Sequence, residues 1–469
     1  MRRWWILASI AFGTFISVVN NSIVNVALPT ISRVMGLDLK VLQWVILVFL
    51  LTVSATLLVA GRLADLVGRK RIYTGGFLVL ISGSLICGLA PGFFILLVGR
   101  VIQAFGAAMP MANGMAITAA TFPPEERGRA LGIVGSVVAI GALLGPVLGG
   151  FLVDILGWRW VFLINLPLGT LAFFTALGLL PQDRPARRGE GFDYPGALLF
   201  AGAIIMLLLG LSGAGTPPVR WGLFLAGVIV AATFIWWERR QPHPLLDLEL
   251  FRLPLFSTSL AAAFLSFLSM SGMMLLTPFY LEEVLGYPPY QVGLLMSPYP
   301  LMMAAVAPVS GWLSDRWGPV GLTTGGLFLN ILALLSLSFM GERASYLEIA
   351  LRLVVLGVGM GMFQSPNNST VMGSVPFQKL GVAGGMNALV RNIGMTVGTA
   401  VVVMLFSTIR QLYLKGVGHP APGEQVAAFL EGWQAVFLFS AGMAALAAVF
   451  SVVRARLLPK LPGDQEVFE

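Results

Sequence analysis

Long apolar runs alternate with short polar segments along the entire chain. Most of these runs are about 18 to 28 residues long, which is enough for a helix to cross a hydrocarbon core about 30 Å thick. We predict fourteen transmembrane helices, at about residues 4–28, 41–60, 72–90, 94–120, 130–154, 159–180, 195–212, 219–238, 254–280, 290–313, 320–340, 346–372, 381–408 and 432–453.

The composition agrees with a chain that lies almost wholly in lipid. Hydrophobic residues make up 57% of it and charged residues only 11%, whereas soluble domains are about 25% charged. No strand-like alternation occurs, so the spans are helices rather than barrel strands. The apolar run that follows Arg2 and Arg3 reaches Pro29 without a small-residue cleavage pattern, which predicts an uncleaved first span rather than a signal peptide.

Basic residues gather on one side of the predicted spans. With a cytoplasmic N-terminus, 19 Lys and Arg fall in cytoplasmic segments, 7 in outer segments and 3 within spans. The positive-inside rule therefore predicts a multi-pass protein of the cytoplasmic (inner) cell membrane with both termini in the cytoplasm. The net charge of +8 is then explained by basic residues at the cytoplasmic surface of the lipid bilayer. The charge therefore does not indicate a nucleic-acid partner.

A sequence repeat divides the chain into halves. Residues 61–68, Gly-Arg-Leu-Ala-Asp-Leu-Val-Gly, return as residues 311–318, Gly-Trp-Leu-Ser-Asp-Arg-Trp-Gly, each time after the second span of a six-span block. The two copies must face the same side of the membrane, so an even number of spans separates them. We predict a six-helix bundle at 1–190, an inserted helix pair with its linkers at 191–250, and a second six-helix bundle at 251–469.

These motifs resemble the major facilitator superfamily, specifically its fourteen-span drug:proton antiporter family, over the whole chain. Residues 61–71 match the signature loop between spans two and three of that family. The alternative is a basic loop that only sets topology. The resemblance implies an all-α fold of two six-helix bundles plus two inserted helices, and a conformational latch on the cytoplasmic side formed by Gly61, Asp65, Gly68, Arg69 and Asp315.

The fifth span matches the antiporter motif of the family. Three of its glycines recur every fourth residue, so they share one helix face that a neighbouring helix can approach closely, and a proline bends the span. The alternative is generic helix packing. The residues of this motif are Gly132, Gly141, Gly145, Pro146 and Gly149.

Two of the three arginines within predicted spans, Arg100 and Arg391, have no acid nearby in the sequence and require compensation. A charge inside the bilayer costs about 2.5 to 3.5 kcal/mol, so it needs a partner or a wet cavity, unless the side chain reaches the surface. Arg100 lies in span four, where the resemblance links an arginine to proton coupling, and Arg391 lies near the middle of the penultimate span. The candidate residues of a substrate cavity are Asn20, Asn21, Asn25, Gln43, Gln103, Asn113, Gln364, Asn387 and Arg391.

The acidic residues depart from the family pattern. An intramembrane aspartate usually occurs nine residues before the proline that corresponds to Pro29, and this chain has Asn20 there. An amide cannot take up and release a coupling proton, as a carboxylate can, and it cannot neutralise a cation. The remaining candidates for proton coupling, beside Arg100, are acids near outer span ends, namely Asp154, Glu282, Glu283 and Glu348. We favour Asp154, because it ends the bent fifth span, and expect Glu348 to pair with Arg352 four residues later.

The leading interpretation is a proton-coupled exporter of drugs or other hydrophobic or amphiphilic small molecules that works by alternating access. A lipid or anionic-metabolite transporter of the same fold, not necessarily proton-coupled, is the alternative, favoured by Arg100, Arg391 and the missing aspartate. An enzyme or receptor is disfavoured, because no HExxH pair or nucleotide-binding loop occurs and His243 and His419 lie in predicted loops. We expect no cofactor and no metal, and a monomer.

Overall fold

The computed structural model describes residues 2–122, 124–182, 192–211, 217–241, 246, 248–375, 380–415 and 421–455. Within these ranges the chain is helical and contains no strand, and 14 helical segments are long and apolar enough to cross a membrane. The prediction of a polytopic all-α protein with fourteen spans is therefore confirmed. The helices are α1 (Arg2–Met35), α2 (Leu39–Leu42), α3 (Trp44–Val67), α4 (Arg69–Gly88), α5 (Phe93–Thr121), α6 (Pro124–Leu156), α7 (Trp160–Leu163), α8 (Asn165–Leu179), α9 (Tyr194–Leu211), α10 (Pro217–Glu238), η1 (Leu248–Arg252), α11 (Pro254–Phe279), η2 (Tyr280–Val284), α12 (Pro289–Met296), α13 (Pro298–Trp317), α14 (Pro319–Ser338), α15 (Tyr346–Gly373), α16 (Leu380–Tyr413) and α17 (Pro422–Ala455).

Four spans consist of two consecutive helices, and the short helix η1 belongs to no span, so nineteen elements account for fourteen crossings among the described residues. The pairs α2–α3, α7–α8, α11–η2 and α12–α13 each form one apolar segment. In the third of these pairs, η2 is a π-turn that follows Pro278, the last proline inside α11. Such π-turns are rare and occur often at functional sites.

The repeated sequence forms the same turn twice. Helix α3 ends at Val67 and α4 begins at Arg69, with Gly68 between them at φ 113°. Helix α13 ends at Trp317 and α14 begins at Pro319, with Gly318 at φ 81°. Only glycine adopts such φ values without strain, so the glycine at the end of each repeat is required by the tight reversal.

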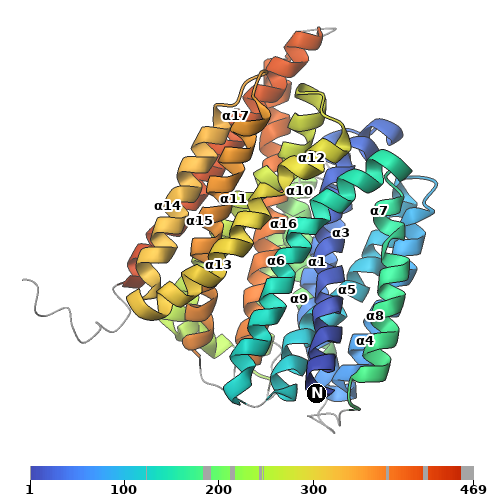
Figure 1. The fold of residues 1–469 in the computed structure, drawn as a ribbon, viewed down its shortest axis with the longest axis vertical. Coiled ribbons are helices and arrows are strands. Elements are labelled where there is room, and N and C mark those ends of the chain that lie inside the picture. Colours follow the sequence, from blue (N-terminus) through green and yellow to red (C-terminus); the bar gives the residue numbers. More distant parts are fainter. Residues whose placement is uncertain are drawn as a thin grey trace, which may run out of the picture.

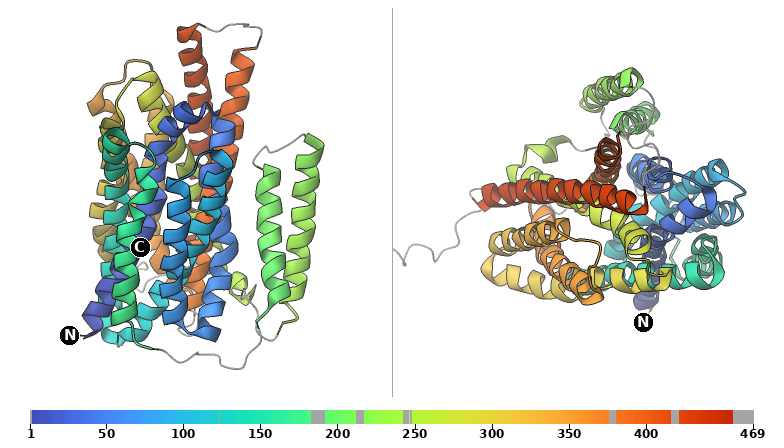
Figure 2. Two further views of the ribbon diagram at one scale, coloured as in Figure 1. Left: turned by 90° about the vertical axis from the view of Figure 1, so that its right-hand side faces the viewer. Right: turned by 90° about the horizontal axis from the view of Figure 1, so that it is seen from above.

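The helices run roughly side by side, as Figure 1 shows. An even number of crossings places the start of α1 and the end of α17 on one face, called here the terminal face, and the end of α1 on the opposite, distal face. The pair α9–α10 lies at the side of the other helices (Figure 2), where α9 contacts both α3 and α16. The division into two six-helix bundles and an inserted pair stays a prediction.

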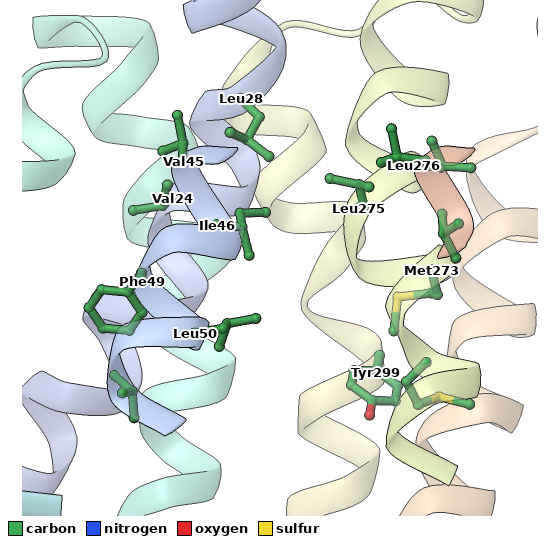
Figure 3. Packing of buried hydrophobic residues seen from close by; sticks show 14 of the residues in the cluster. Val24, Leu28, Val45, Ile46, Phe49, Leu50, Met273, Leu275, Leu276 and Tyr299 are labelled. Carbon is green, nitrogen blue, oxygen red and sulfur yellow. The ribbon is translucent and has the colours of Figure 1, made fainter. Parts of the chain in front are cut away.

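One apolar cluster joins the two halves in their distal part. It contains Val24 and Leu28 of α1 and Phe49 of α3, together with Leu276 of α11 and Tyr299 of α13, all with at most 6% of their surface exposed. Figure 3 shows α1 and α3 facing α11 across this cluster. The two halves therefore meet through side chains near the distal face.

Candidate functional site

An ion pair crosses between the halves at the distal face. Arg33, in the last turn of α1, donates to the Glu282 carboxylate of η2 with an N–O distance of 2.6 Å. Only 1% of the Glu282 side chain is exposed, against 64% for Arg33, and Oε1 of Glu282 has no hydrogen-bond partner. The contact fastens one half to the other through a single buried carboxylate.

Helices α6 and α12 approach each other at backbone distance, also in the distal part of the two halves. A methyl group added at Gly150 would meet the Pro289 carbonyl oxygen, and one added at Gly293 would meet the Pro146 carbonyl oxygen. The rings of Phe151 and Tyr290 lie 6.2 Å apart, centroid to centroid, across the same contact. The absence of side chains at the two glycines therefore lets the halves close.

The glycine face of α6 packs on α1, within the N-terminal half. A methyl group at Gly141 would lie 3.1 Å from Val18, one at Gly149 would lie 2.8 Å from the Ile23 carbonyl oxygen, and one at Gly145 would overlap the Ser22 hydroxyl. The close approach predicted for this face is present, and its partner is α1. Gly132 lies on α6, and its surroundings are outside the described part of the structure.

A cavity of about 20 Å³, room for roughly one water molecule, lies between the halves beneath the distal contacts. It is lined by polar and apolar side chains from both halves: Asn21, Asn25, Ile46, Leu50, Ser271, Met274, Leu275, Met395 and Thr399. Two of the residues predicted for a substrate cavity, Asn21 and Asn25, are among them. This cavity is too small for a drug-sized molecule, so the distal part of the interface is closed.

Arg100 is buried inside the N-terminal half with uncharged partners. Its Nε donates to the Val45 carbonyl oxygen at 2.9 Å and its Nη1 to Oε1 of Gln103 at 2.6 Å. The guanidinium carbon lies 4.1 Å from the ring centroid of Phe49 and 5.9 Å from that of Phe162. Snorkelling to the surface is ruled out, because the residue is only 1% exposed. The positive charge is therefore stabilised by the dipoles of the carbonyl and amide partners and by the faces of the two aromatic rings.

Asn20 and Gln103 extend this network rather than line the cavity. The Gln103 amide donates to Oδ1 of Asn20 at 2.9 Å and to the Ser84 hydroxyl at 2.7 Å, while Asn165 donates to the same Asn20 oxygen at 2.8 Å. Both Asn20 and Gln103 have no exposed surface. Neither side chain lines the cavity between the halves, and a role of either in substrate binding stays a prediction.

The other predicted cavity residues divide by environment. Gln43 and Asn113 are each 2% exposed and donate to carbonyl oxygens of their own segments, those of Lys40 and Met109. Asn387 on α16 is partly exposed and donates to Oδ1 of Asn368 at 2.9 Å. The remaining two, Gln364 and Arg391, are partly exposed.

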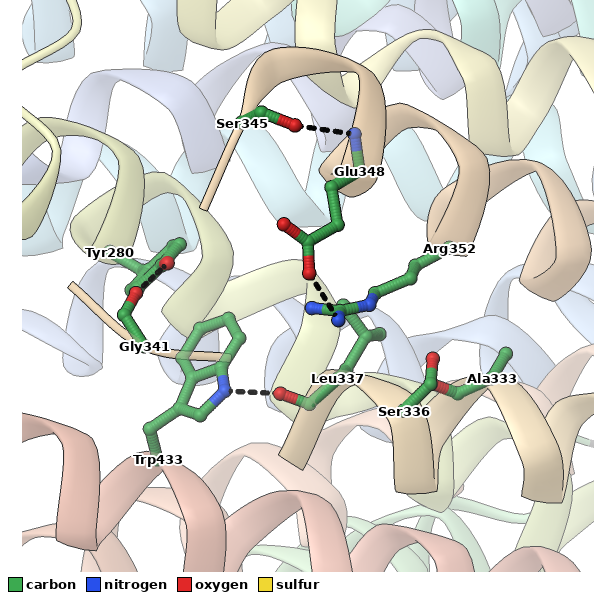
Figure 4. A network of polar contacts seen from close by, with 9 residues as sticks. All are labelled: Tyr280, Ala333, Ser336, Leu337, Gly341, Ser345, Glu348, Arg352 and Trp433. Carbon is green, nitrogen blue, oxygen red and sulfur yellow. Dashed lines mark hydrogen bonds and ion pairs between the residues drawn. The ribbon is translucent and has the colours of Figure 1, made fainter. Parts of the chain in front are cut away.

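The four acidic candidates for proton coupling also differ in their exposure and in their partners. Asp154, favoured from the sequence, is an exposed residue near the end of α6. Glu348 pairs with Arg352 at 2.5 Å on the surface of α15, as predicted, beside the hydrogen bond from Trp433 to the Leu337 carbonyl (Figure 4). Glu283 is exposed. Glu282 alone among these four acids is both buried and paired with the opposite half.

The signature loop is described in part. Gly61 lies on α3, where an added methyl group would come 3.9 Å from Ala112 of α5, and Arg69 donates to the Ala116 carbonyl oxygen at 3.5 Å. Asp65 and Asp315 lie on α3 and α13, and their side chains are outside the described part of the structure. Their role in a latch stays a prediction.

A second buried guanidinium was missed from the sequence. Arg454, assigned there to the cytoplasmic tail, lies in the last turn of α17 with no exposed surface. It donates to Asn367 at 2.8 Å, to Thr323 at 2.5 Å and to Ser259 at 3.2 Å, and thereby ties four helices of the C-terminal half. Both buried and solvated arginines occur at the end of an apolar run. The position of Arg454 in the sequence therefore gives no signal of its burial.

Comparison with known proteins identifies the family. Residues 10–399 match the family model of the Major Facilitator Superfamily. The chain belongs to the major facilitator superfamily. It is 34% identical over 399 residues to the riboflavin transporter RibZ of Clostridioides difficile, covering 85% of this chain and 87% of that protein. It is 36% identical over 408 residues to the multidrug resistance protein Stp of Mycobacterium tuberculosis, covering 86% and 76%.

Solved structures share the major facilitator fold. A bacterial homolog of the human lysosomal transporter Spinster, in an inward-facing and occupied conformation, matches with a TM-score of 0.70 at 18% identity over 97% of each chain. Relatives named for multidrug resistance and antibiotic export agree with the fourteen-span drug:proton antiporter family. The protein is therefore a multi-pass membrane transporter of small molecules.

Proposed function

We propose that this protein is a secondary active transporter that exports hydrophobic or amphiphilic small molecules by alternating access, driven by protons. The observation that carries the proposal is the distal closure, in which the halves meet through the Arg33–Glu282 ion pair and the Gly150–Gly293 contact. Both contacts are small and lie at one face, so rocking of the halves can break them without unfolding either half. Relatives named for multidrug resistance and antibiotic export support the direction.

The charge distribution supports an orientation for this closure. Basic residues favour a cytoplasmic terminal face by 19 to 7, so the distal face is the outer one in our proposal. The conformation described is then closed toward the outside. Glu282 is in this scheme the proton carrier: protonation removes its charge, breaks the attraction to Arg33 and favours opening of the outer side.

The proposal is tested in inside-out vesicles from cells that overproduce the protein. Accumulation of a lipophilic dye should require a proton gradient and collapse when an uncoupler is added, and vesicles without the protein provide the background. Accumulation that survives the uncoupler would contradict proton drive. Absence of transport for every dye, and for riboflavin as the substrate named for one relative, would contradict the exporter itself.

A second candidate, transport of lipids or anionic metabolites, is favoured by the cationic side chains. Arg100, Arg391 and Arg454 lie within the spans, and none of them contacts an acidic side chain in the described part of the chain. A low-dielectric interior with fixed positive charge disfavours a cationic substrate. Competition between a cationic dye and an anionic amphiphile of similar size separates the two candidates.

A further inference from the structure

Arg391 differs from the two other arginines that lie deep in the spans. Arg100 and Arg454 are at most 1% exposed and donate to named partners. Arg391 is partly exposed and has no hydrogen bond, ion pair or ring contact in the described part of the chain. Its five N–H donors are therefore available to a ligand.

The position of Arg391 on α16 places it toward the interface between the halves. It precedes Met395 and Thr399 by four and eight residues, so the three share one side of the helix, and the latter two line the cavity. Val382 and Met404, both 37% exposed, lie about 180° and 140° away around the same helix. The side of α16 that carries Arg391 is thus the interior one, and the opposite side is the more exposed one.

Arg391 lies about 6 Å from Met395 along the helix axis, on the side of the cavity toward the terminal face, where α16 begins. Along the cavity itself the walls combine amide groups, from Asn21 and Asn25, with apolar surface from Leu50 and Leu275. A molecule that reached this cavity from the terminal face would pass the guanidinium and then meet a mainly apolar wall.

We propose that Arg391 is a substrate-binding residue that selects amphiphiles carrying a single anionic group, such as a carboxylate, on an apolar body. This inference rests on the proposed transport function and adds the substrate class. A guanidinium in a low-dielectric site is costly when unpaired, and a carboxylate satisfies its planar fork through two parallel hydrogen bonds. The apolar body occupies the wall formed by Leu50, Leu275 and their neighbours.

The test uses a matched pair of probes, dansyl-undecanoic acid and its methyl ester, bound to purified protein in lipid nanodiscs. Wild-type protein should bind the acid more tightly than the ester. Arg391→Gln should weaken binding of the acid about tenfold, equal to about 1.4 kcal/mol, and change that of the ester less than twofold. Arg391→Lys should retain part of the preference, because the charge remains and the fork is lost. Arg343→Gln, which removes a charge at an exposed position, is the control.

The inference is overturned if Arg391→Gln weakens both probes equally, which indicates a structural role, or if it changes neither. Equal binding of acid and ester by the wild type also overturns it. Arg391→Met, apolar and unbranched, answers the same question should the glutamine variant fail to fold. Transport of the same probes in inside-out vesicles separates the two proposals. If acid and ester are transported equally and the Arg391 variants transport both as the wild type does, the substrate class proposed here is wrong and the transport function stands. If the protein binds the acid selectively but transports neither probe, the proposed transport function is contradicted.

Discussion

Asn20 occupies the centre of a buried hydrogen-bond network in the N-terminal half. Its Oδ1 accepts from Gln103 and from Asn165, while its Nδ2 has no partner. A buried donor without a partner costs about 1 to 3 kcal/mol. The acceptor side of the amide is therefore fully used in this site, whereas its donor side is not satisfied.

Asn20→Asp should fold and be less destabilised than Asn20→Leu, because it keeps the acceptor oxygen that both hydrogen bonds use. Asn20→Leu should lower the thermal unfolding temperature, since it leaves the amides of Gln103 and Asn165 without their shared acceptor. Unfolding followed by intrinsic tryptophan fluorescence in detergent measures both changes. An aspartate variant less stable than the leucine variant would refute the network described here. Position 20 does not line the cavity, so the negative charge of the aspartate variant would act on Arg100 of the same network before it acted on a substrate.

Glu282→Gln should abolish gradient-driven accumulation while substrate exchange continues, because a glutamine cannot take up and release the coupling proton. Glu283→Gln is the matched control: it neutralises the neighbouring acid, which is exposed, and should retain most of the wild-type uptake. Uptake and exchange of a labelled substrate in proteoliposomes, with and without an imposed pH gradient, distinguish these outcomes. Undiminished uptake by the Glu282 variant would remove it from proton coupling.

At the scale of the helix, α6 serves two partners with different glycines. Gly141, Gly145 and Gly149 pack on α1 within one half, and Gly150 packs on α12 of the other half. The sequence predicts that such a face exists, because small residues recur every fourth position. The sequence does not predict which helix packs against this face. Every side of a membrane helix is apolar, so the pattern does not distinguish one neighbouring helix from another.

For the same reason, the sequence does not predict whether a single polar residue of a span faces the interior of one half or the interface between the halves. Asn20 and Asn21 are adjacent in the sequence, yet one lies inside the N-terminal half and the other lines the cavity. Span number, the turns at Gly68 and Gly318 and the pairing of Glu348 with Arg352 follow from local rules and were predictable. The pairing of Arg33 with Glu282 joins residues 249 positions apart, and only the packing of the halves brings them together.

Gly150→Ala should impair transport more than Gly145→Ala. The methyl group at Gly150 meets the Pro289 carbonyl oxygen on the opposite backbone, so the halves must separate. At Gly145 it meets Ser22 of the same half, so the contact between the halves is unaffected. Membrane insertion and thermal stability should be close to wild type for the Gly150 variant. Initial transport rates in vesicles, normalised to protein amount, provide the measurement; equal rates for the two variants would count against a role of Gly150 in distal closure.

At the scale of the whole molecule, distal closure must be reversible for transport to proceed. Phe151 and Tyr290 face each other across the two halves with their rings 6.2 Å apart. They mark a point where the distance between the halves can be fixed chemically. Cys87 is the sole cysteine of the chain and is buried, so it can be replaced to give a clean background.

Phe151→Cys combined with Tyr290→Cys, in a Cys87→Ala background, should be cross-linked by a short thiol-reactive linker and lose transport. A reducing agent that cleaves the linker should restore it. Each single-cysteine variant, treated identically, is the control and should keep its activity. Full activity of the cross-linked protein would mean that the halves do not separate here during the cycle.

The contact of α9 with both α3 and α16 closes one long edge of the seam between the halves to lipid. The other edge, where α6 meets α12 and α13, has no such cover among the described helices. An amphiphile dissolved in the bilayer would then enter sideways along that uncovered edge only. Lipid-soluble photoreactive probes should accordingly label cysteines introduced along the α6–α13 edge, and spare those behind α9.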